Sequence, residues 1–262
     1  MEELELTTAQ KSIADFILYT VAPGKHCARS AIVHLENSWR LRSVDPAMSV
    51  FRSITAVEES TTAIFHTLKR RGYKGADNLQ ARSHAHKAAL RPFLLAIESN
   101  FAQSNLTPFS PALEFRGSGT DGRILIRFTV PDSPEEERYG YPQPPLHFAL
   151  GRNGVTYDFS DELKSIAETH NEQSILKYVK ELANRRNTLL YASSAGVPKV
   201  VDLSDGFLMK QRDIVFQHLT IYLLIDPYAQ QQLFVQQCLD AFLKMLDILP
   251  DDSSIDNENA AT

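Results

Sequence analysis

The sequence predicts a mainly α-helical bundle that carries a small antiparallel β insertion. Three observations favour this fold class. Apolar residues recur at helical spacing through most of residues 1–104 and again through residues 160–250. Between these stretches, residues 105–159 hold short apolar runs separated by turn residues, which is typical of strands. With 262 residues, 43% of them hydrophobic and 23% charged, the chain can bury a substantial core.

Four helices are predicted in residues 1–104, and local signals set their ends. Pro23-Gly24 stops the first helix, because neither residue suits a helix interior. Asp45 can cap the third helix, and Gly72 can close it. Pro92 lies inside the fourth helix and predicts a bend there. The four predicted helices span Thr7–Thr20, His26–Arg42, Pro46–Arg71 and Asn78–Ala102.

Residues 105–159 are predicted to form the β insertion. Asn153-Gly154 is a hairpin signal, because both residues accept the positive dihedrals of a tight turn. The stretch Pro131–Pro145 contains five prolines and three consecutive glutamates, so it is predicted to be an irregular loop. The predicted strands are Ala112–Phe115, Ile124–Val130, Leu146–Leu150 and Val155–Phe159.

Helical patterning returns in residues 160–250 and completes the same bundle. One helix is predicted over Ser160–Arg185, followed by a loop that carries Gly196 and Pro198. Ser204 can cap a second helix that runs to Leu224. Asp226-Pro227 gives the cap and first position of a last helix, which ends near Leu249. Residues 251–262 form a polar, acidic tail that is predicted to be disordered.

Charge and cysteine content narrow the class of protein. The net charge of −5 weighs against general nucleic-acid binding, although it leaves room for a local basic site. Two cysteines, Cys27 and Cys238, are too few for a disulfide framework or a thiolate metal cluster. No apolar run reaches the roughly 18 residues of a membrane span. The acidic first residues do not resemble a signal peptide, so we expect a cytoplasmic protein without membrane association. No cofactor-binding motif is present, so no cofactor is expected.

The strongest candidate for chemistry is the segment from Arg212 to His218. Arginine followed by a polar residue, with histidine after an apolar spacer, is the outline of an Arg/His ribonuclease site. Arg212 would clamp the scissile phosphate, His218 would move protons and Asp213 would orient one of them. On a straight helix the two side chains lie about 120° and about 9 Å apart, so both must reach one cleft. The alternative is a surface arginine and a satisfied helical histidine.

A second candidate group lies at the end of the helix predicted over Ser160–Arg185. Arg186, Asn187 and Tyr191 could line the same cleft or its edge. Tyrosine is a poor base at neutral pH because its reference pKa is about 10, yet it can donate a hydrogen bond to phosphate. The alternative is a helix C-terminus whose arginines complement the helix dipole.

A third group lies in the two helices Pro46–Arg71 and Asn78–Ala102. Arg52, Glu59 and His66 are seven residues apart and share one helix face. His86 is the titratable member of an apolar seam and needs a partner, for which Glu59 is the natural carboxylate. His84 and His86 point about 200° apart on a helix, which argues against shared metal ligation. We therefore expect no metal site, and a network of ion pairs and hydrogen bonds in which Glu59, His86 and Arg52 support the cleft.

Three blocks, taken together, carry a family resemblance. They are the apolar helix Ser53–Ser60 with its Glu58-Glu59 pair, the segment His84–Lys87, and the segment Arg186–Ala192 with Gly196 and Pro198 beyond it. In its order of blocks the chain resembles the HEPN superfamily of helical domains, and within it the abortive-infection AbiV type. The resemblance covers about Ala28–Pro198.

The chain also departs from the family pattern. Ser60-Thr61 follows the glutamate pair where Gly-Lys is usual, and Ser193 stands where aspartate is common. The superfamily's Arg-x(4–6)-His signature ends in Tyr191 in the copy that starts at Arg186. The copy Arg212–His218 fits literally but lies beyond the AbiV-like region.

The resemblance implies a helical bundle, frequent dimerisation, and a role in antiphage defence or toxin–antitoxin biology. Many superfamily members are metal-independent endoribonucleases, and others are binding modules. The leading hypothesis is therefore an endoribonuclease acting on RNA through Arg212 and His218. The competing hypothesis is a non-catalytic protein that forms a homodimer through the apolar segment Leu219–Ile225 and presents the β insertion to a phage or host protein.

Overall fold

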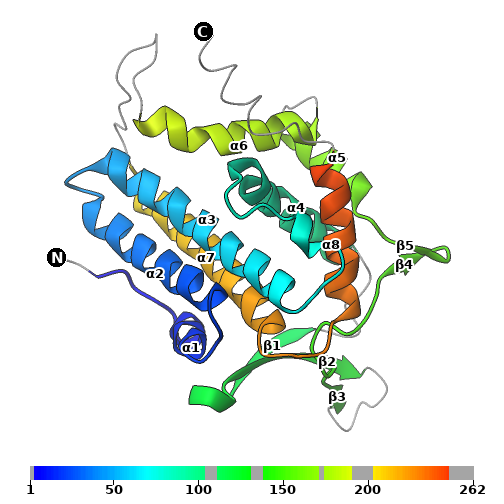
Figure 1. Ribbon diagram of the computed structural model, residues 1–262. Coiled ribbons are helices and arrows are strands. Elements are labelled where there is room, and N and C mark those ends of the chain that lie inside the picture. The colour runs from blue at the N-terminus through cyan, green and yellow to red at the C-terminus, as the bar shows by residue number, and fades with distance from the viewer. Residues whose placement is uncertain (1–2, 104–110, 131–137, 171–173, 191–202, 248–262) are drawn as a thin grey trace.

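The computed structural model describes residues 3–103, 111–130, 138–170, 174–190 and 203–247, without the side chains of residues 185–190. The protein is mainly α-helical with a small antiparallel β insertion, as predicted (Figure 1). The helices are α1 Thr8–Ile17, α2 Gly24–Leu41, α3 Pro46–Arg70, α4 His84–Gln103, α5 Ser160–Thr169, α6 Ile175–Leu190, α7 Asp205–Ile225 and α8 Leu233–Leu246. The predicted tail 251–262 lies outside the described residues.

Helix α3 is the centre of the bundle. It packs along α2 on one side and along α7 on another, and it also contacts α4 and α6 (Figure 1). Helix α6 crosses the end of this group and contacts both α3 and α4. Among the described helices, none is both long enough and apolar enough to cross a membrane.

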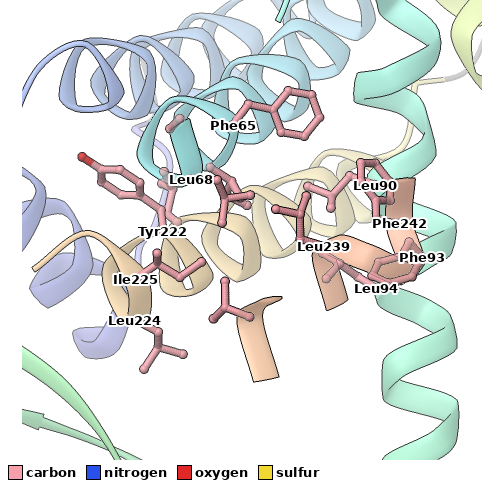
Figure 2. Packing of buried hydrophobic residues seen from close by; sticks show 14 of the residues in the cluster. Phe65, Leu68, Leu90, Phe93, Leu94, Tyr222, Leu224, Ile225, Leu239 and Phe242 are labelled. Atoms are coloured by element: carbon pink, nitrogen blue, oxygen red, sulfur yellow. The ribbon is translucent and has the colours of Figure 1, made fainter. Parts of the chain in front are cut away.

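The apolar core gathers where α3, α4, α7 and α8 meet (Figure 2). Phe93 of α4 lies 5.3 Å from Phe242 of α8, and Phe242 lies 6.2 Å from Phe65 of α3, measured between ring centroids. Tyr222 of α7 is also fully buried, with its ring close to Gly24 of α2. Each aromatic ring removes a large apolar area from water, so this junction is the main apolar stabilisation of the bundle.

Two predicted helix caps are present. The Asp45 carboxylate accepts a hydrogen bond from the Met48 amide at 3.0 Å, with Pro46 at the first position of α3. The Ser204 hydroxyl accepts one from the Phe207 amide at 3.2 Å. These bonds satisfy amides that have no partner inside the helix.

The largest differences from the predicted helix boundaries concern α4, the pair α5 and α6, and α8. Helix α4 begins at His84 rather than near Asn78, because the Ser83 hydroxyl caps it through the His86 amide at 3.1 Å. The helix predicted over Ser160–Arg185 is two helices, α5 and α6, and α5 ends at Thr169. Helix α8 begins at Leu233, not at Pro227, because Asp226 is held as the C-cap of α7.

The insertion forms two separate β elements. Strands β1 Ala112–Arg116, β2 Arg123–Val130 and β3 Arg138–Gly140 make a sheet in the order β1-β2-β3. Strands β4 Gly151–Arg152 and β5 Val155–Thr156 pair around Asn153-Gly154, whose φ angles of 54° and 78° confirm the predicted tight turn. Strand β3 falls within the stretch that was predicted to be an irregular loop.

The predicted strand Leu146–Leu150 is absent for an identifiable reason. Backbone groups of Leu146 and Leu150 are satisfied by Gln232, the N-cap of α8, and by Gln237 within α8 instead of by a neighbouring strand. Gln232 accepts a hydrogen bond from the Leu146 amide at 2.7 Å, and Gln237 bonds both the amide and the carbonyl of Leu150 at 2.8 Å. The two glutamines replace a strand partner, so this segment crosses α8 without joining a sheet.

Candidate functional site

The buried polar side chains of α3 form the most distinctive part of the structure. Glu58, Ser60, Thr61 and Thr67 are all buried, although they lie on the central helix of an apolar bundle. A buried polar group is costly unless it is hydrogen-bonded. Each of these side chains meets a polar group on a neighbouring helix, α4 or α7. The neighbours of α3 are therefore fixed by polar contacts as well as by apolar packing.

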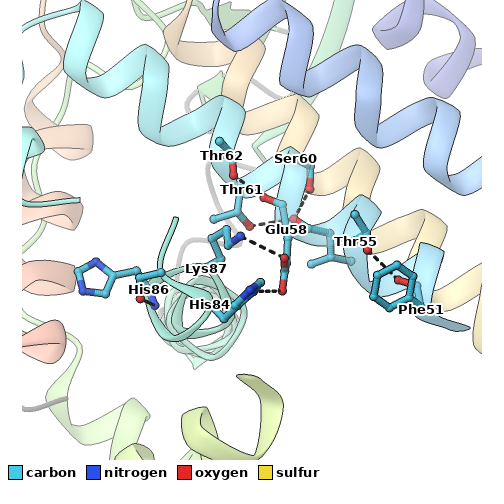
Figure 3. A network of polar contacts seen from close by, with 11 residues as sticks. Phe51, Thr55, Glu58, Ser60, Thr61, Thr62, His84, His86 and Lys87 are labelled. Atoms are coloured by element: carbon cyan, nitrogen blue, oxygen red, sulfur yellow. Dashed lines mark hydrogen bonds and ion pairs between the residues drawn. The ribbon is translucent and has the colours of Figure 1, made fainter. Parts of the chain in front are cut away.

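The clearest cluster joins α3 to α4 through Glu58 (Figure 3). One carboxylate oxygen lies 2.8 Å from Nδ1 of His84, and the other lies 3.1 Å from Nζ of Lys87. Glu58 and Lys87 are buried, whereas the His84 side chain is 40% exposed. Two of the three blocks that carry the family resemblance are thus in direct contact.

The pKa of Glu58 is set by two opposing effects, burial on one side and contacts with His84 and Lys87 on the other. Burial alone raises the pKa of this carboxyl, because it disfavours the charged form. The hydrogen bond from His84 and the positive charge of Lys87 outweigh burial and hold the pKa below its ordinary value. Glu58 is therefore ionised at neutral pH and can orient the His84 ring. A carboxylate-oriented, half-exposed histidine has the form of a general acid or base.

The sequence prediction paired the wrong members of these two segments. His86 was expected to meet Glu59, but its Nδ1 lies 3.2 Å from the Gln80 amide. Glu59 belongs to the face of α3 that packs along α2. Burial raises the pKa of Cys27 on α2, and the negative charge of Glu59 raises it further. Arg52 lies on that face as well, and its guanidinium is 3.5 Å from Nδ1 of His34 on α2. These residues support helix packing, not the Glu58 cluster.

His218 does not lie at a cleft. Its side chain has no exposed surface, and its Nδ1 is 3.0 Å from the Ser60 hydroxyl and 3.3 Å from the Thr61 hydroxyl. Both hydroxyls point their protons at the Val57 carbonyl, at 2.8 and 3.0 Å. Nδ1 must therefore be the donor, and Nε2 is left as a buried acceptor with no partner among the described residues.

The proposed catalytic role of His218 is corrected by this environment. Burial, with the nearby positive charge of Arg91, lowers the pKa of His218 to about 3. At neutral pH the ring is uncharged and out of reach of a phosphate. His218 is a core residue that positions α7 against α3.

Arg212 and Asp213 likewise serve packing. The Arg212 guanidinium donates to Asp213 at 3.0 Å and to the Glu5 carbonyl at 2.9 Å. The same Asp213 oxygen accepts a bond from Gln10 of α1 at 3.3 Å. These contacts hold the N-terminal segment and α1 against α7. His218 faces α3 instead, so the structure does not bring the predicted clamp and the predicted acid/base together.

The remaining predicted residues are only partly described. Arg186 and Asn187 lie in α6, whose backbone packs against α3 and α4, but their side chains are outside the described part of the chain. Tyr191 lies outside it altogether. The described residues contain no group of three or more His, Cys, Asp or Glu that could hold a metal ion.

The predicted dimer segment is part of the core. Leu219, Tyr222 and Leu223 are at most 2% exposed, and Leu224 and Ile225 at most 5%. These five side chains are covered by the same chain and are not available to a second copy, whereas Thr220 and Ile221 are partly exposed.

A cluster on the β insertion was missed at the sequence level. Arg116, Arg127, Tyr139 and Tyr141 surround Glu114 on one face of the sheet; we call this set the Arg/Tyr face. The guanidinium of Arg116 lies 4.4 Å from the centre of the Tyr141 ring, and that of Arg127 lies 5.3 Å from the Tyr139 ring. Glu114 accepts from Arg116 at 2.8 Å, and this contact lowers its pKa.

The strand register explains the grouping of the Arg/Tyr face. Ala112 pairs with Arg127, Glu114 with Leu125, and Thr129 with Tyr139, so alternate residues of three strands meet on one side. The period-two pattern of charged and aromatic residues in Glu114-Phe115-Arg116 was visible in the sequence. Strand β3, which supplies Tyr139 and is followed by Tyr141, was hidden in a proline-rich stretch.

Comparison with known proteins adds no relative to these observations. No family model, no curated protein and no solved structure matches the chain.

The environment of His218 gives a test by pH. The unfolded chain protonates this histidine below about pH 6.5, while the folded chain keeps it neutral down to about pH 3. A lowered folded-state pKa means that stability is present above pH 6.5 and is lost as the pH falls. The free energy of unfolding should decrease by up to about 1.4 kcal/mol per pH unit between pH 6.5 and 5.

Urea unfolding at pH 7, 6 and 5 measures this slope. The variant His218→Asn removes the titrating ring and should lose that part of the pH dependence. The exposed residue His170 provides the matched control, His170→Asn, which should keep it. Equal slopes in the wild type and His218→Asn would show that the ring is not held neutral by burial.

Proposed function

We propose that this chain is a HEPN-like interaction protein of bacterial antiphage defence or toxin–antitoxin type, which binds a phage or host protein through its β insertion. The Arg/Tyr face is the observation that carries the proposal. Arginine and tyrosine are the residue types enriched at interface hot spots. The free thiols of Cys27 and Cys238 fit the reducing cytoplasm that we propose as its location.

The charge of the Arg/Tyr face indicates the kind of partner. Two guanidinium groups share the single carboxylate of Glu114, so the face has an excess positive charge. The side chains of Arg116 and Arg127 are 52% and 29% exposed, and Tyr139 is 49% exposed. An acidic protein surface complements this face, because opposite potentials steer encounter and fix register.

The packing roles of Arg212 and His218, which replace the predicted catalytic roles, also support an interaction protein. Arg212 holds the N-terminal segment against α7 through the Glu5 carbonyl, and His218 holds α7 against α3 through Ser60. Homodimerisation, which the family resemblance implies, remains part of the proposal, at a surface other than Leu219–Ile225.

Site-specific photocrosslinking tests the docking surface. With benzoylphenylalanine at Tyr139, cells challenged with phage should yield a crosslinked partner that is absent when the probe replaces the exposed Lys11 of α1. The double variant Arg116→Ala, Arg127→Ala should reduce the crosslinked product about tenfold or more, because each hot-spot arginine contributes more than about 1 kcal/mol. Equal crosslinking from both probe positions, or none from Tyr139, would contradict the proposal.

A second candidate function is a metal-independent endoribonuclease centred on Glu58 and His84. The 2.8 Å contact between them favours it, since Glu58 can fix the ring of the half-exposed His84 for proton transfer to RNA. Helix α6, which carries the third block of the resemblance, packs against the two helices that supply this pair.

Incubation of total RNA with purified protein in EDTA tests the second candidate. If the activity is present, His84→Ala should reduce the rate of cleavage about 10²- to 10⁴-fold, the usual loss for a general acid or base. The control His218→Asn should leave the rate unchanged, because that ring is buried. Absence of cleavage, or equal rates in the wild type and His84→Ala, removes this candidate and leaves the interaction protein.

A further inference from the structure

The junction of α3, α4, α7 and α8 contains an apolar pocket that neither proposed function uses (Figure 2). Its volume is about 170 Å³. Each of the four helices contributes to the wall, for example through Phe65, Phe93, Ile225 and Phe242. The described lining includes no residue of the Arg/Tyr face and neither Glu58 nor its two partners, so the pocket is a separate feature of the molecule.

The lining offers no strong hydrogen-bonding group in the described part of the chain. It consists of Leu, Ile, Val and Phe side chains and of Cys238. Burial raises the pKa of the Cys238 thiol, so this group is uncharged at neutral pH. A water molecule in a cavity needs two to four polar partners, so this pocket suits an apolar occupant and not ordered water.

The volume of the pocket matches a small ring. An engineered apolar cavity of roughly 150 Å³ stays dry and binds benzene. An empty apolar cavity destabilises a core in proportion to its volume, because the side chains around it lose contacts. A ligand that fills the pocket restores those contacts at the junction of the four helices.

Phenylalanine rings favour an aromatic occupant over an aliphatic one. Phe65, Phe93, Phe234 and Phe242 all line the pocket. The ring centroids of Phe93 and Phe242 are 5.3 Å apart with the planes inclined by 57°, and those of Phe65 and Phe242 are 6.2 Å apart at 48°. Inclined aromatic rings attract at these distances, because the positive edge of one ring meets the negative face of the next. One more ring in the pocket would extend this arrangement.

We propose that this pocket binds one uncharged monocyclic aromatic hydrocarbon of about the size of benzene. The ring packs among the four phenylalanine rings. It carries no hydroxyl, amine or carboxylate, because the wall has no partner for such a group and burying it unpaired costs free energy. This site goes beyond both proposed functions and rests on neither of them.

Titration calorimetry on the full chain tests the proposal with benzene and phenol as probes. Benzene should bind saturably, with one site per chain. Phenol is almost the same size, but its hydroxyl would lack a partner in the pocket, so it should bind about fivefold more weakly or worse. This comparison needs no variant. Absence of saturable benzene binding, or equal affinity for the two probes, overturns the proposal.

Two substitutions at one position then locate the site. Cys238→Leu adds bulk inside the pocket and should weaken benzene binding about tenfold or more, because the added methyl groups and the ligand compete for one packed space. Cys238→Ala is the matched control: it also removes the thiol but leaves the space, so it should bind benzene at least as tightly as the wild type. Circular dichroism checks the fold of both variants. Equal benzene affinity in the two variants would mean that the ligand binds elsewhere and would contradict the proposal.

Discussion

The contact on which the rest of the bundle depends is the buried carboxylate of Glu58 on α3. A charge removed from water must be paired, and Glu58 is paired twice, by Lys87 and by His84. Apolar helix faces tolerate sliding, whereas these two contacts exist in one register only. They therefore fix α4 against α3. The apolar junction around Phe65 then packs in the register that the polar contacts allow.

The same logic explains α7. The His218 ring lies against Ser60, and Asp226 at the C-cap of α7 accepts a hydrogen bond from Thr67 at 2.7 Å and pairs with Arg70. Polar groups on α3 thus contact α7 at two positions along its length, which fixes the direction of α7 and its rotation about its own axis. The residues that look catalytic in the sequence are for the most part those that hold helices together. The Arg/Tyr face, which we propose as the partner-binding surface, lies elsewhere, on the β insertion.

Much of the fold could be predicted because the signals are local. Helical periodicity, the Asp45 and Ser204 caps and the Asn153-Gly154 turn act within a few residues, and each is present in the structure. The start of α4 was placed too early, because helical spacing continues through residues that form a turn capped by Ser83.

What could not be predicted depends on residues distant in the chain. Gln232 at the N-cap of α8 and Gln237 within α8 satisfy the backbone at Leu146 and Leu150, which no local pattern reveals. The burial of His218 depends on the hydroxyls of α3, more than 150 residues earlier. A double-mutant cycle on Glu58→Gln and Lys87→Met, measured by urea unfolding at pH 7, tests the central role of the polar contacts most directly. Each single variant should lose about 3 kcal/mol or more, and the double variant should lose less than their sum by about 1 to 3 kcal/mol. Additive losses, or single losses below about 0.5 kcal/mol, would mean that apolar packing alone sets the register of the bundle.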